Sequence, residues 1–158
     1  MAAIRPAAAF DVYSVKAIYD EYVASSIATF DTAPPPLGSW DEKLDRMYIA
    51  DDDPGVIGFA YASTYRARPA YDGTVETTIY LAPEAVGKGV GRGLYQALFD
   101  RLDSEGVHTS VAVIALPNDA SVGLHLEFGF VEAGVLREVG HKFGRWIDTA
   151  FYQRLRHE

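Results

Sequence analysis

Apolar residues near the start of the chain recur every three to four positions, which is the spacing of one face of a helix. Over residues 11–25 this pattern predicts an amphipathic helix that packs on a core, and Asp11 is suited to cap its first turn. The apolar positions of this helix are Val15, Ile18, Tyr19 and Tyr22. Residues 4–6 indicate a short strand before it. The chain therefore opens with a strand followed by a core-facing helix.

Turn residues indicate where a second helix begins. The segment 32–36 ends in three consecutive prolines, and it predicts an extended break in the chain. Ser39, followed three positions later by Glu42, then matches a capping box, in which each side chain satisfies the backbone N–H of the other residue. These signals predict a helix that runs from the box to about Met47.

Apolar runs in the middle of the chain predict strands. Three of them precede a glycine-rich stretch and are expected to form antiparallel neighbours: residues 48–50, 56–65 and 74–81. Residues 110–114 are apolar at almost every position, whereas a half-exposed strand would alternate, so this strand is expected to be central. Residues 130–155 contain two more strand-like stretches, joined near residues 142–145.

Two helices are predicted between and after these strands. Residues 91–105 carry leucines on one stripe, and Gly106 ends the helix. The leucines are Leu94, Leu98 and Leu102. A further helix is predicted over residues 120–128. At 158 residues the whole chain, 1–158, fits a single domain.

The run from Gly87 to Gly93 is expected to cradle a phosphate. Every second residue of it is glycine, which lets backbone N–H groups gather round an anion, and the helix that follows adds its positive dipole end. Lys88 and Arg92 reinforce that field. A glycine-rich surface turn is the alternative for such a run in isolation. The position between a strand and a helix favours the cradle.

Two common phosphate motifs do not match this run. A Walker loop requires Ser or Thr directly after the Gly-Lys pair, and Lys88 is followed by Gly89. A dinucleotide fingerprint requires a third glycine three residues after the second, and the positions that would hold it are Arg92 or Leu94. The spacing therefore argues against both a nucleoside-triphosphatase and a Rossmann site.

Charge and composition exclude several functional classes. The formal charge of −8 disfavours a nucleic-acid partner, because such binding depends on Lys and Arg neutralising phosphates. The chain contains no cysteine, which excludes thiol catalysis and Cys-ligated zinc and is compatible with a reducing compartment. No stretch approaches the roughly 20 apolar residues of a membrane span, and no signal peptide is apparent at the N-terminus. We expect a cytoplasmic protein with no membrane partner and no metal.

Four landmarks in order give the chain a resemblance to a known family. They are residues 66–76 (RARPAYDGTVE), the glycine loop, residues 112–121 (AVIALPNDAS) and residues 140–148 (GHKFGRWID). Together they resemble the phosphinothricin and methionine sulfoximine branch of the GNAT N-acetyltransferases. The resemblance is specific from Arg66 to Asp148 and weaker from Ile4 to Gln153. The chain departs from the family pattern at Val86, where Gln or Arg is usual, and at Leu126, where Glu is usual.

The resemblance implies a fold and a ligand. The implied fold is of the α/β (α+β) class: a mixed, twisted sheet of about seven strands flanked by about four helices, splayed where acetyl-coenzyme A enters. The loop is implied to hold the pyrophosphate, and one strand to pair with the pantetheine arm through its backbone. The residues implied in cofactor binding are Gly87, Lys88, Gly89, Val90, Gly91, Arg92 and Asn118, with the backbone of Ile79, Tyr80 and Leu81. Asn118 also suits the cap of the helix that follows it. A homodimer is implied as well.

Two side chains are candidates for proton transfer. Glu76 lies in mid-strand on the same face as Thr78 and Tyr80, where a carboxylate is unusual. Acetyl transfer needs a neutral amine, so Glu76 is expected to take its proton, directly or through water. His125 occupies the position where many GNAT enzymes carry a tyrosine thought to protonate the leaving thiolate. The alternatives are a solvent-facing Glu76 and a structural His125.

The acceptor is expected to be a small amine with an acidic group. Arg66, Arg68 and Tyr71 precede Glu76 on a loop, and a guanidinium fork can grip a carboxylate or phosphinate. Solvated loop arginines are the alternative. The resemblance implies that Lys142 lines the same pocket from a neighbouring subunit, together with Phe143 and Trp146, and a core position is the alternative for Trp146.

The predicted function is direct transfer of acetyl from acetyl-coenzyme A to the α-amino group of a small amino acid or analogue. The analogues implied by the resemblance are phosphinothricin, methionine sulfoximine and methionine sulfone. Two alternatives stay open at this point. One is an enzyme of the same fold that acts on a protein N-terminus or a polyamine, and the other is a non-catalytic sensor of acetyl-coenzyme A.

Overall fold

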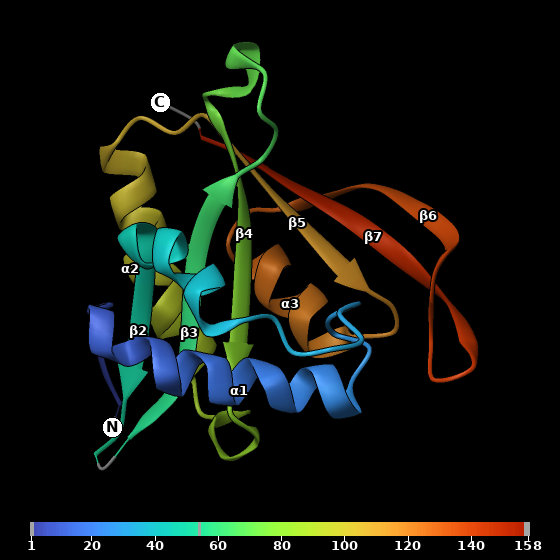
Figure 1. Ribbon diagram of the computed structural model, residues 1–158. Coiled ribbons are helices and arrows are strands. Elements are labelled where there is room, and N and C mark those ends of the chain that lie inside the picture. Colours follow the sequence, from blue (N-terminus) through green and yellow to red (C-terminus); the bar gives the residue numbers. More distant parts are fainter. Residues whose placement is uncertain (1, 54, 157–158) are drawn as a thin grey trace.

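A computed structural model describes residues 2–53 and 55–156, and within them one mixed sheet of seven strands forms the centre of the molecule (Figure 1). The strands are β1 (Ala3–Pro6), β2 (Met47–Asp51), β3 (Val56–Thr64), β4 (Thr74–Leu81), β5 (Thr109–Ala115), β6 (Val131–Lys142) and β7 (Arg145–Leu155). Their order is β1-β2-β3-β4-β5-β7-β6. The pairing of β4 with β5 is parallel, and the other pairings are antiparallel.

Helices cover both faces of the sheet. The α-helices of the described residues are α1 (Val12–Ser25), α2 (Val90–Ser104) and α3 (Asp119–Glu127). The 3-10 segments are η1 (Ala9–Asp11), η2 (Leu37–Arg46), η3 (Pro69–Tyr71) and η4 (Pro83–Ala85). In Figure 1, α1 and η2 lie in front of β2 to β4, and α2 lies behind them.

The sequence of strand β3 explains why the two faces of the sheet differ. Phe59 and Tyr61 pack with α1 and η2 on one face, whereas Ala60 and Ala62 face α2 on the other. Successive strand residues point to opposite faces, so the alternation of aromatic and small residues makes one thick and one thin layer. The alanines allow α2 to approach the sheet closely.

The sheet opens between β4 and β5. The two strands pair only where residues 74–76 lie beside residues 109–111, although β4 continues to Leu81 and β5 to Ala115. Beyond Glu76 they diverge, as Figure 1 shows. The backbone edge of β4 after Glu76 therefore has no neighbouring strand on this side, and a gap forms near the centre of the molecule.

The mixed, splayed α/β architecture predicted from the sequence is confirmed. Three antiparallel strands do precede the glycine loop, and β5 is central, between β4 and β7. Continuous burial of β5 was expected, but Val113 is 42% exposed because it lines the gap that the splay creates.

The expected capping box at Ser39 is wrong. Residues 37–46 form the 3-10 helix η2, which starts after Pro36, so Ser39 lies inside the first turn rather than before it. Its hydroxyl donates back to the Pro36 carbonyl at 2.6 Å and does not accept from a forward N–H. Because η2 begins directly after the proline run, the Pro36 carbonyl lies beside Ser39, and the hydroxyl donates to that carbonyl.

The expected side-chain cap at Asp11 is also wrong. The 3-10 turn η1 precedes α1, and the Asp11 carboxylate turns back to accept the Ala8 N–H at 2.7 Å. The same carboxylate receives two guanidinium hydrogen bonds of 2.8 Å from Arg5 on β1. Asp11 therefore ties the first strand to the start of α1.

Candidate functional site

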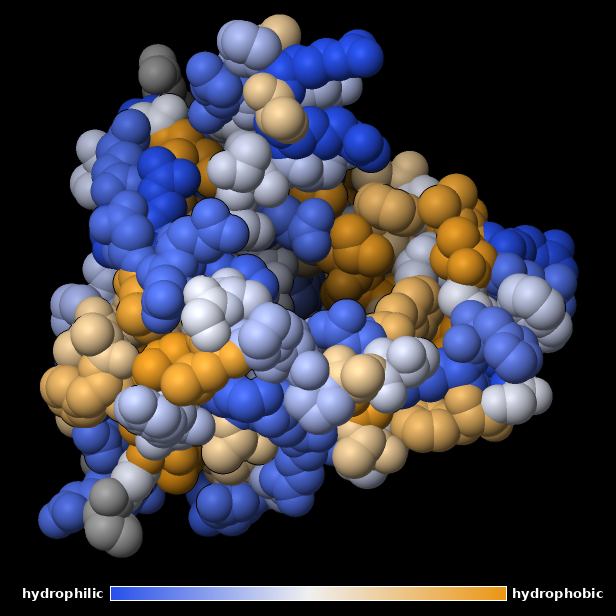
Figure 2. Space-filling model, viewed as in Figure 1, coloured by the Kyte–Doolittle hydropathy of each residue, from blue (hydrophilic) through white to orange (hydrophobic). Residues whose placement is uncertain are grey.

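The gap between β4 and β5 widens into a cleft of about 520 Å³. Its lining comes from the end of α1 and the segment after it, from β4 and β5, and from α3. Figure 2 shows a hollow near the centre of this face, with apolar side chains beside it over the region of β5 to β7. Of the predicted site residues, this cleft brings together Glu76, Ile79, Tyr80, Leu81, Asn118 and His125.

Glu76 lies at the point where the strands separate. Its side chain is half-buried, and burial raises the pKa of its carboxyl group above the ordinary value, although the charge of Arg66 opposes the shift. A carboxylate with a raised pKa is a stronger base than an exposed one. The position and the pKa are both suited to receiving a proton from an amine in the cleft.

His125 is 2% exposed and has partners on both ring nitrogens. Nδ1 lies 2.7 Å from the Ser121 carbonyl oxygen, which can only accept, so Nδ1 carries the proton. Nε2 lies 2.7 Å from the Tyr95 hydroxyl and accepts from it. Burial lowers the pKa of the imidazole, which is therefore neutral. These contacts favour the structural alternative, and protonation of a leaving thiolate by His125 stays a prediction.

The glycine loop has the geometry of an anion cradle. Gly87 and Gly89 both have φ of 79°, a left-handed conformation that favours glycine. A Cβ at either position would meet no atom within 4 Å, so the space in front of the loop is open. Gly89 caps α2, and the Gly93 N–H is bonded to its carbonyl at 3.1 Å. The first N–H groups of α2 have no partner within the helix, and N–H groups in this position can bind an anion; binding of a diphosphate by the loop stays a prediction.

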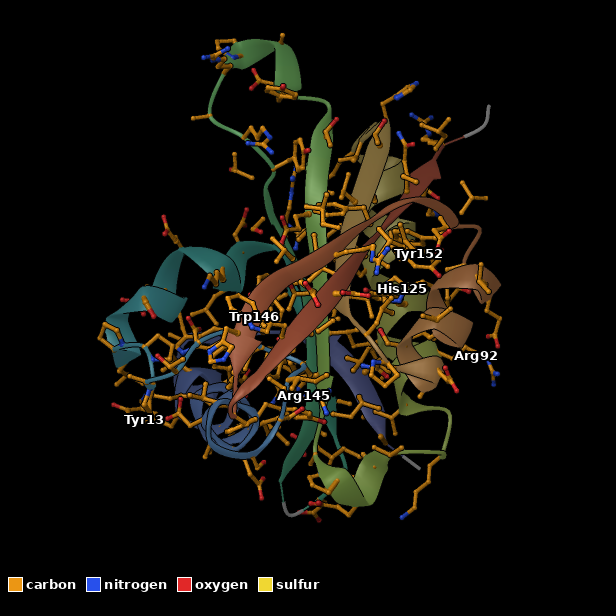
Figure 3. The ribbon with its side chains drawn as sticks, turned by 90° about the vertical axis from the view of Figure 1, so that its right-hand side faces the viewer. Tyr13, Arg92, His125, Arg145, Trp146 and Tyr152 are labelled. Atoms are coloured by element: carbon orange, nitrogen blue, oxygen red, sulfur yellow. The ribbon has the colours of Figure 1, made fainter. Side chains whose placement is uncertain are left out.

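Arg92 is not a free cation. Its Nε lies 2.6 Å from Glu127 Oε2, and its Nη2 lies 3.0 Å from Oε1. The guanidinium lowers the pKa of the Glu127 carboxyl group. Figure 3 shows Arg92 on the side of the molecule where α3 lies. Glu127 was not among the predicted site residues, because 35 positions of chain separate it from Arg92 and nothing in its local sequence indicates the contact.

Asn118 has the predicted capping role. Its Oδ1 accepts the Ser121 N–H at 3.1 Å, and the residue is the N-cap of α3. It also lines the cleft, together with Leu124 and His125 of α3. Contact between Asn118 and a cofactor stays a prediction.

Arg66, Arg68 and Tyr71 lie together but outside the cleft. They line a separate depression with Tyr65 and Ala67 beyond the end of β3. The Arg66 guanidinium lies over the Tyr65 ring at 5.1 Å, and the Tyr65 and Tyr71 ring centroids are 5.5 Å apart. The only link to the cleft among these contacts is electrostatic, through the effect of Arg66 on Glu76.

Lys142 points into its own chain. Its Nζ donates to the carbonyls of Ser26 at 2.7 Å and Thr29 at 2.8 Å, and the residue is 5% exposed. Its neighbours at the tip of the β6–β7 hairpin behave differently, since Phe143 and Trp146 are exposed. Direct contact of Lys142 with a substrate stays a prediction that these hydrogen bonds do not favour.

Two parts of the cleft lining were not predicted from the sequence. Tyr22 was predicted as core, but it lines the cleft and donates to the Leu81 carbonyl at 2.6 Å. A tyrosine near the end of an amphipathic helix is a weak signal for such a role, because the residue has an apolar ring and a polar tip. Residues 26–28 also line the cleft, and their sequence carries no motif.

Comparison with known proteins decides the family. The model of the acetyltransferase (GNAT) domain matches residues 1–151. The chain belongs to the GNAT acetyltransferase family. The prediction of a GNAT acetyltransferase enzyme is thereby confirmed.

Three proteins similar to this chain are acetyltransferases whose names state an acceptor. The phosphinothricin N-acetyltransferase of Streptomyces coelicolor is 44% identical over 96% of this chain and 94% of its own length. The L-methionine sulfoximine/L-methionine sulfone acetyltransferase of Pseudomonas paraeruginosa is 37% identical over 96% and 93%. The crystal structure of a phosphinothricin acetyltransferase from Sinorhizobium meliloti in complex with AcCoA has a TM-score of 0.92 and 40% identity, covering 98% of this chain and 88% of that one.

Two further observations concern membranes and metal ions. Across residues 2–53 and 55–156, no helix is both long and apolar enough to cross a bilayer. Within the same residues, no three side chains among His, Asp and Glu are grouped as a metal site would require.

Proposed function

We propose that this GNAT enzyme transfers acetyl from acetyl-coenzyme A to the α-amino group of a small amino acid or analogue of the phosphinothricin, methionine sulfoximine or methionine sulfone type. One observation carries the proposal. A half-buried carboxylate, Glu76, lies where β4 and β5 part, in a cleft whose other end reaches the residue before the glycine loop, Val86. The names of the similar proteins support the class of acceptor.

The donor is proposed to lie along β4. The N–H groups of Gly87 to Arg92 would hold the diphosphate, and Lys88 would add charge. The unpaired edge of Ile79 to Leu81 offers backbone groups to the amide-containing arm, as an added strand would. Asn118 would meet the same arm from α3. These residues place the thioester carbonyl in the cleft beside Glu76.

The chemistry then requires few protein groups. The ammonium of the acceptor gives a proton to Glu76, directly or through water, and the neutral nitrogen attacks the thioester carbonyl. The C–N bond forms, the C–S bond breaks, and the leaving thiolate of coenzyme A takes up the proton that the new amide nitrogen loses, directly or through water. Much of the acceleration comes from holding the two reactants in position. His125 is proposed to act on the thiolate only indirectly, by accepting the Tyr95 hydroxyl and so orienting that side chain at the cleft.

Recognition of the acceptor is proposed to involve the loop before β4. Arg66, Arg68 and Tyr71 would attract the acidic head group, and Arg66 already acts electrostatically on Glu76. Because these side chains line their own depression, the loop would have to move towards the cleft when the acceptor binds.

A homodimer is part of the proposal. Strand β6 is at the edge of the sheet and carries exposed apolar side chains, and the hairpin tip adds two aromatic rings. The exposed apolar residues of the strand and the hairpin tip are Val131, Val135, Leu136, Val139, Phe143 and Trp146. Figure 3 shows Trp146 on the β6–β7 hairpin. An exposed edge strand with an apolar row is suited to pair with a second copy of the chain. A cytoplasmic location without a nucleic-acid partner accords with the absence of cysteine and the charge of −8.

The test is release of free coenzyme A from acetyl-coenzyme A with a panel of amines. Phosphinothricin, methionine sulfoximine, methionine sulfone, ordinary amino acids, a polyamine and a peptide with a free N-terminus would be compared at one concentration. Release with the first three above the rest supports the proposal. Release only with the peptide or polyamine would support the alternative acceptors. Binding of acetyl-coenzyme A without release for any amine would support a sensor.

A further inference from the structure

The segment that follows α1, residues 26–31, has no regular structure, yet part of it forms a wall of the cleft. Ser26, Ile27 and Ala28 line the same cleft as Glu76. A loop wall of a reaction cleft must be held in place by contacts from elsewhere in the fold, because it has no ladder of its own hydrogen bonds.

Lys142 supplies two of those contacts from the far end of the sequence. Its ammonium donates to the Ser26 and Thr29 carbonyls at 2.7 and 2.8 Å, and so spans the segment. Placing an ammonium group in a buried position is unfavourable, and burial lowers the pKa of Lys142. Two charge-assisted hydrogen bonds to the segment offset that cost, and one of them goes to Ser26, which lines the cleft.

The β6–β7 hairpin touches the segment at a second point. A Cβ placed on Gly140 would lie 2.3 Å from the Phe30 ring, which shows how closely the ring packs on the strand. From the other side, the Tyr80 hydroxyl donates to the Ala28 carbonyl at 3.1 Å, and the Tyr19 hydroxyl lies 2.6 Å from Thr29 Oγ1. The segment is therefore held between the hairpin and the aromatic layer under α1.

We propose that Lys142 is a positioning residue for the acceptor amine: it fixes segment 26–31 so that Ser26, Ile27 and Ala28 shape the acceptor half of the cleft. The inference rests on the proposed function. It assigns the segment to the acceptor because the donor contacts belong to β4, the glycine loop and α3, none of which is bonded to Lys142. It replaces direct contact between Lys142 and the substrate with action through the loop.

The test compares Lys142→Met with wild type, using Lys43→Met as a matched control on η2. Lys43 lies over the Trp40 ring at 4.7 Å and does not line the cleft. For Lys142→Met we expect the KM for the best acceptor to rise about tenfold or more, with a smaller change in kcat and an unchanged Kd for acetyl-coenzyme A. Lys142→Arg, which keeps two donors, should recover part of the loss. Lys43→Met should leave all three values unchanged.

A second variant reaches the same segment without changing a charge. Gly140→Ala pushes the Phe30 ring, which is partly exposed and can swing away, so the protein should fold. We expect the same rise in KM for the acceptor. Unchanged KM for the acceptor in both variants would overturn the proposal, and so would a loss of acetyl-coenzyme A binding equal to the loss of acceptor binding.

Hydrogen exchange separates this inference from the proposed function. Amides of residues 26–31 should exchange faster in Lys142→Met than in wild type or Lys43→Met, whether or not a substrate is known. If wild type acetylates none of the amines, the proposed function fails while faster exchange still supports the anchor. If wild type is active and exchange at 26–31 is unchanged in Lys142→Met, Lys142 does not position the segment.

Discussion

Arg92 and Glu127 form a two-point ion pair between the first turn of α2 and the last residue of α3, with N–O distances of 2.6 and 3.0 Å. Arg92 is one of the two cations beside the glycine loop, and Glu127 brings a negative charge to the same place. The pair therefore competes with any diphosphate for the guanidinium.

Removing the carboxylate should strengthen acetyl-coenzyme A binding. In Glu127→Gln the Arg92 guanidinium is free and one negative charge near the polyanion is lost, so Kd should fall about threefold to tenfold at low salt. The gain should shrink as salt is added. Calorimetry measures it, with Glu42→Gln as a control for loss of a distant carboxylate. Weaker binding in Glu127→Gln would instead mean that the pair holds the cradle in shape.

Glu76 is expected to be essential for turnover and unimportant for donor binding. Glu76→Gln keeps the shape but cannot take a proton, so kcat should fall by about 10²-fold or more while the Kd for acetyl-coenzyme A stays the same. In wild type, kcat/KM should rise with pH through the raised pKa of this carboxyl group. Steady-state rates between about pH 5 and 9 test both points, and full turnover of Glu76→Gln across that range would remove the assignment.

The same substitution should stabilise the fold at neutral pH. The pKa of Glu76 is raised in the folded state, so the unfolded chain ionises at lower pH and the carboxylate costs stability once the pH exceeds the ordinary glutamate value. The cost grows up to the folded pKa and is then constant. Thermal unfolding of Glu76→Gln should therefore show a higher Tm than wild type at pH 8 and a smaller difference near pH 4. Equal differences at both values would contradict the sign.

His125 should contribute mainly to stability. In His125→Ala the Tyr95 hydroxyl loses its acceptor in the core and a cavity is left, which should cost about 2 kcal/mol or more. Because burial lowers the pKa of His125, wild type should lose stability as the pH falls from about 6.5 towards the folded pKa, and the variant should lack this loss. Denaturant unfolding from pH 5 to 8 measures it. A folded variant with greatly reduced kcat would favour the catalytic role.

Trp146 should contribute to assembly. Its ring is 64% exposed on the β6–β7 hairpin, and within residues 2–53 and 55–156 the aromatic ring that it packs on is that of His141, at 4.7 Å between centroids. Trp146→Glu would place a charge on the apolar row and should convert a dimer into a monomer. Sedimentation of wild type and variant measures the oligomeric state. Tyr13→Glu, at an exposed position of α1, is the control. A wild-type monomer would end the dimer proposal.

Local signals predicted most of the fold. The run 74–81 alternates, and β4 has those bounds. The stripe of Leu94, Leu98 and Leu102 predicted α2, and all three are fully buried. Such patterns succeed because side-chain periodicity depends only on the local backbone. The predicted caps at Ser39 and Asp11 show the limit of local reasoning. Each side chain bonds to a backbone group of a preceding residue, Pro36 or Ala8, and not to the N–H expected of a cap.

The lining of the cleft was predicted in part. Glu76, Asn118 and the strand edge lie in one cleft, and each belongs to a motif that is continuous in the sequence. The arginine loop lies in a depression of its own, and Lys142 faces inwards. Motifs indicate which residue types are present, and they do not indicate the direction in which a long side chain points.

The sequence by itself determined the order of the elements, the glycine loop before α2 and the mid-strand carboxylate, because each depends on residues within a few positions of one another. Only the tertiary structure decided that Glu127 neutralises Arg92, that Tyr95 donates to His125 and that Lys142 anchors the loop after α1. Those contacts join residues 30 to 116 positions apart, and their partners are chosen by packing across the sheet. No periodicity or spacing in the chain encodes that choice.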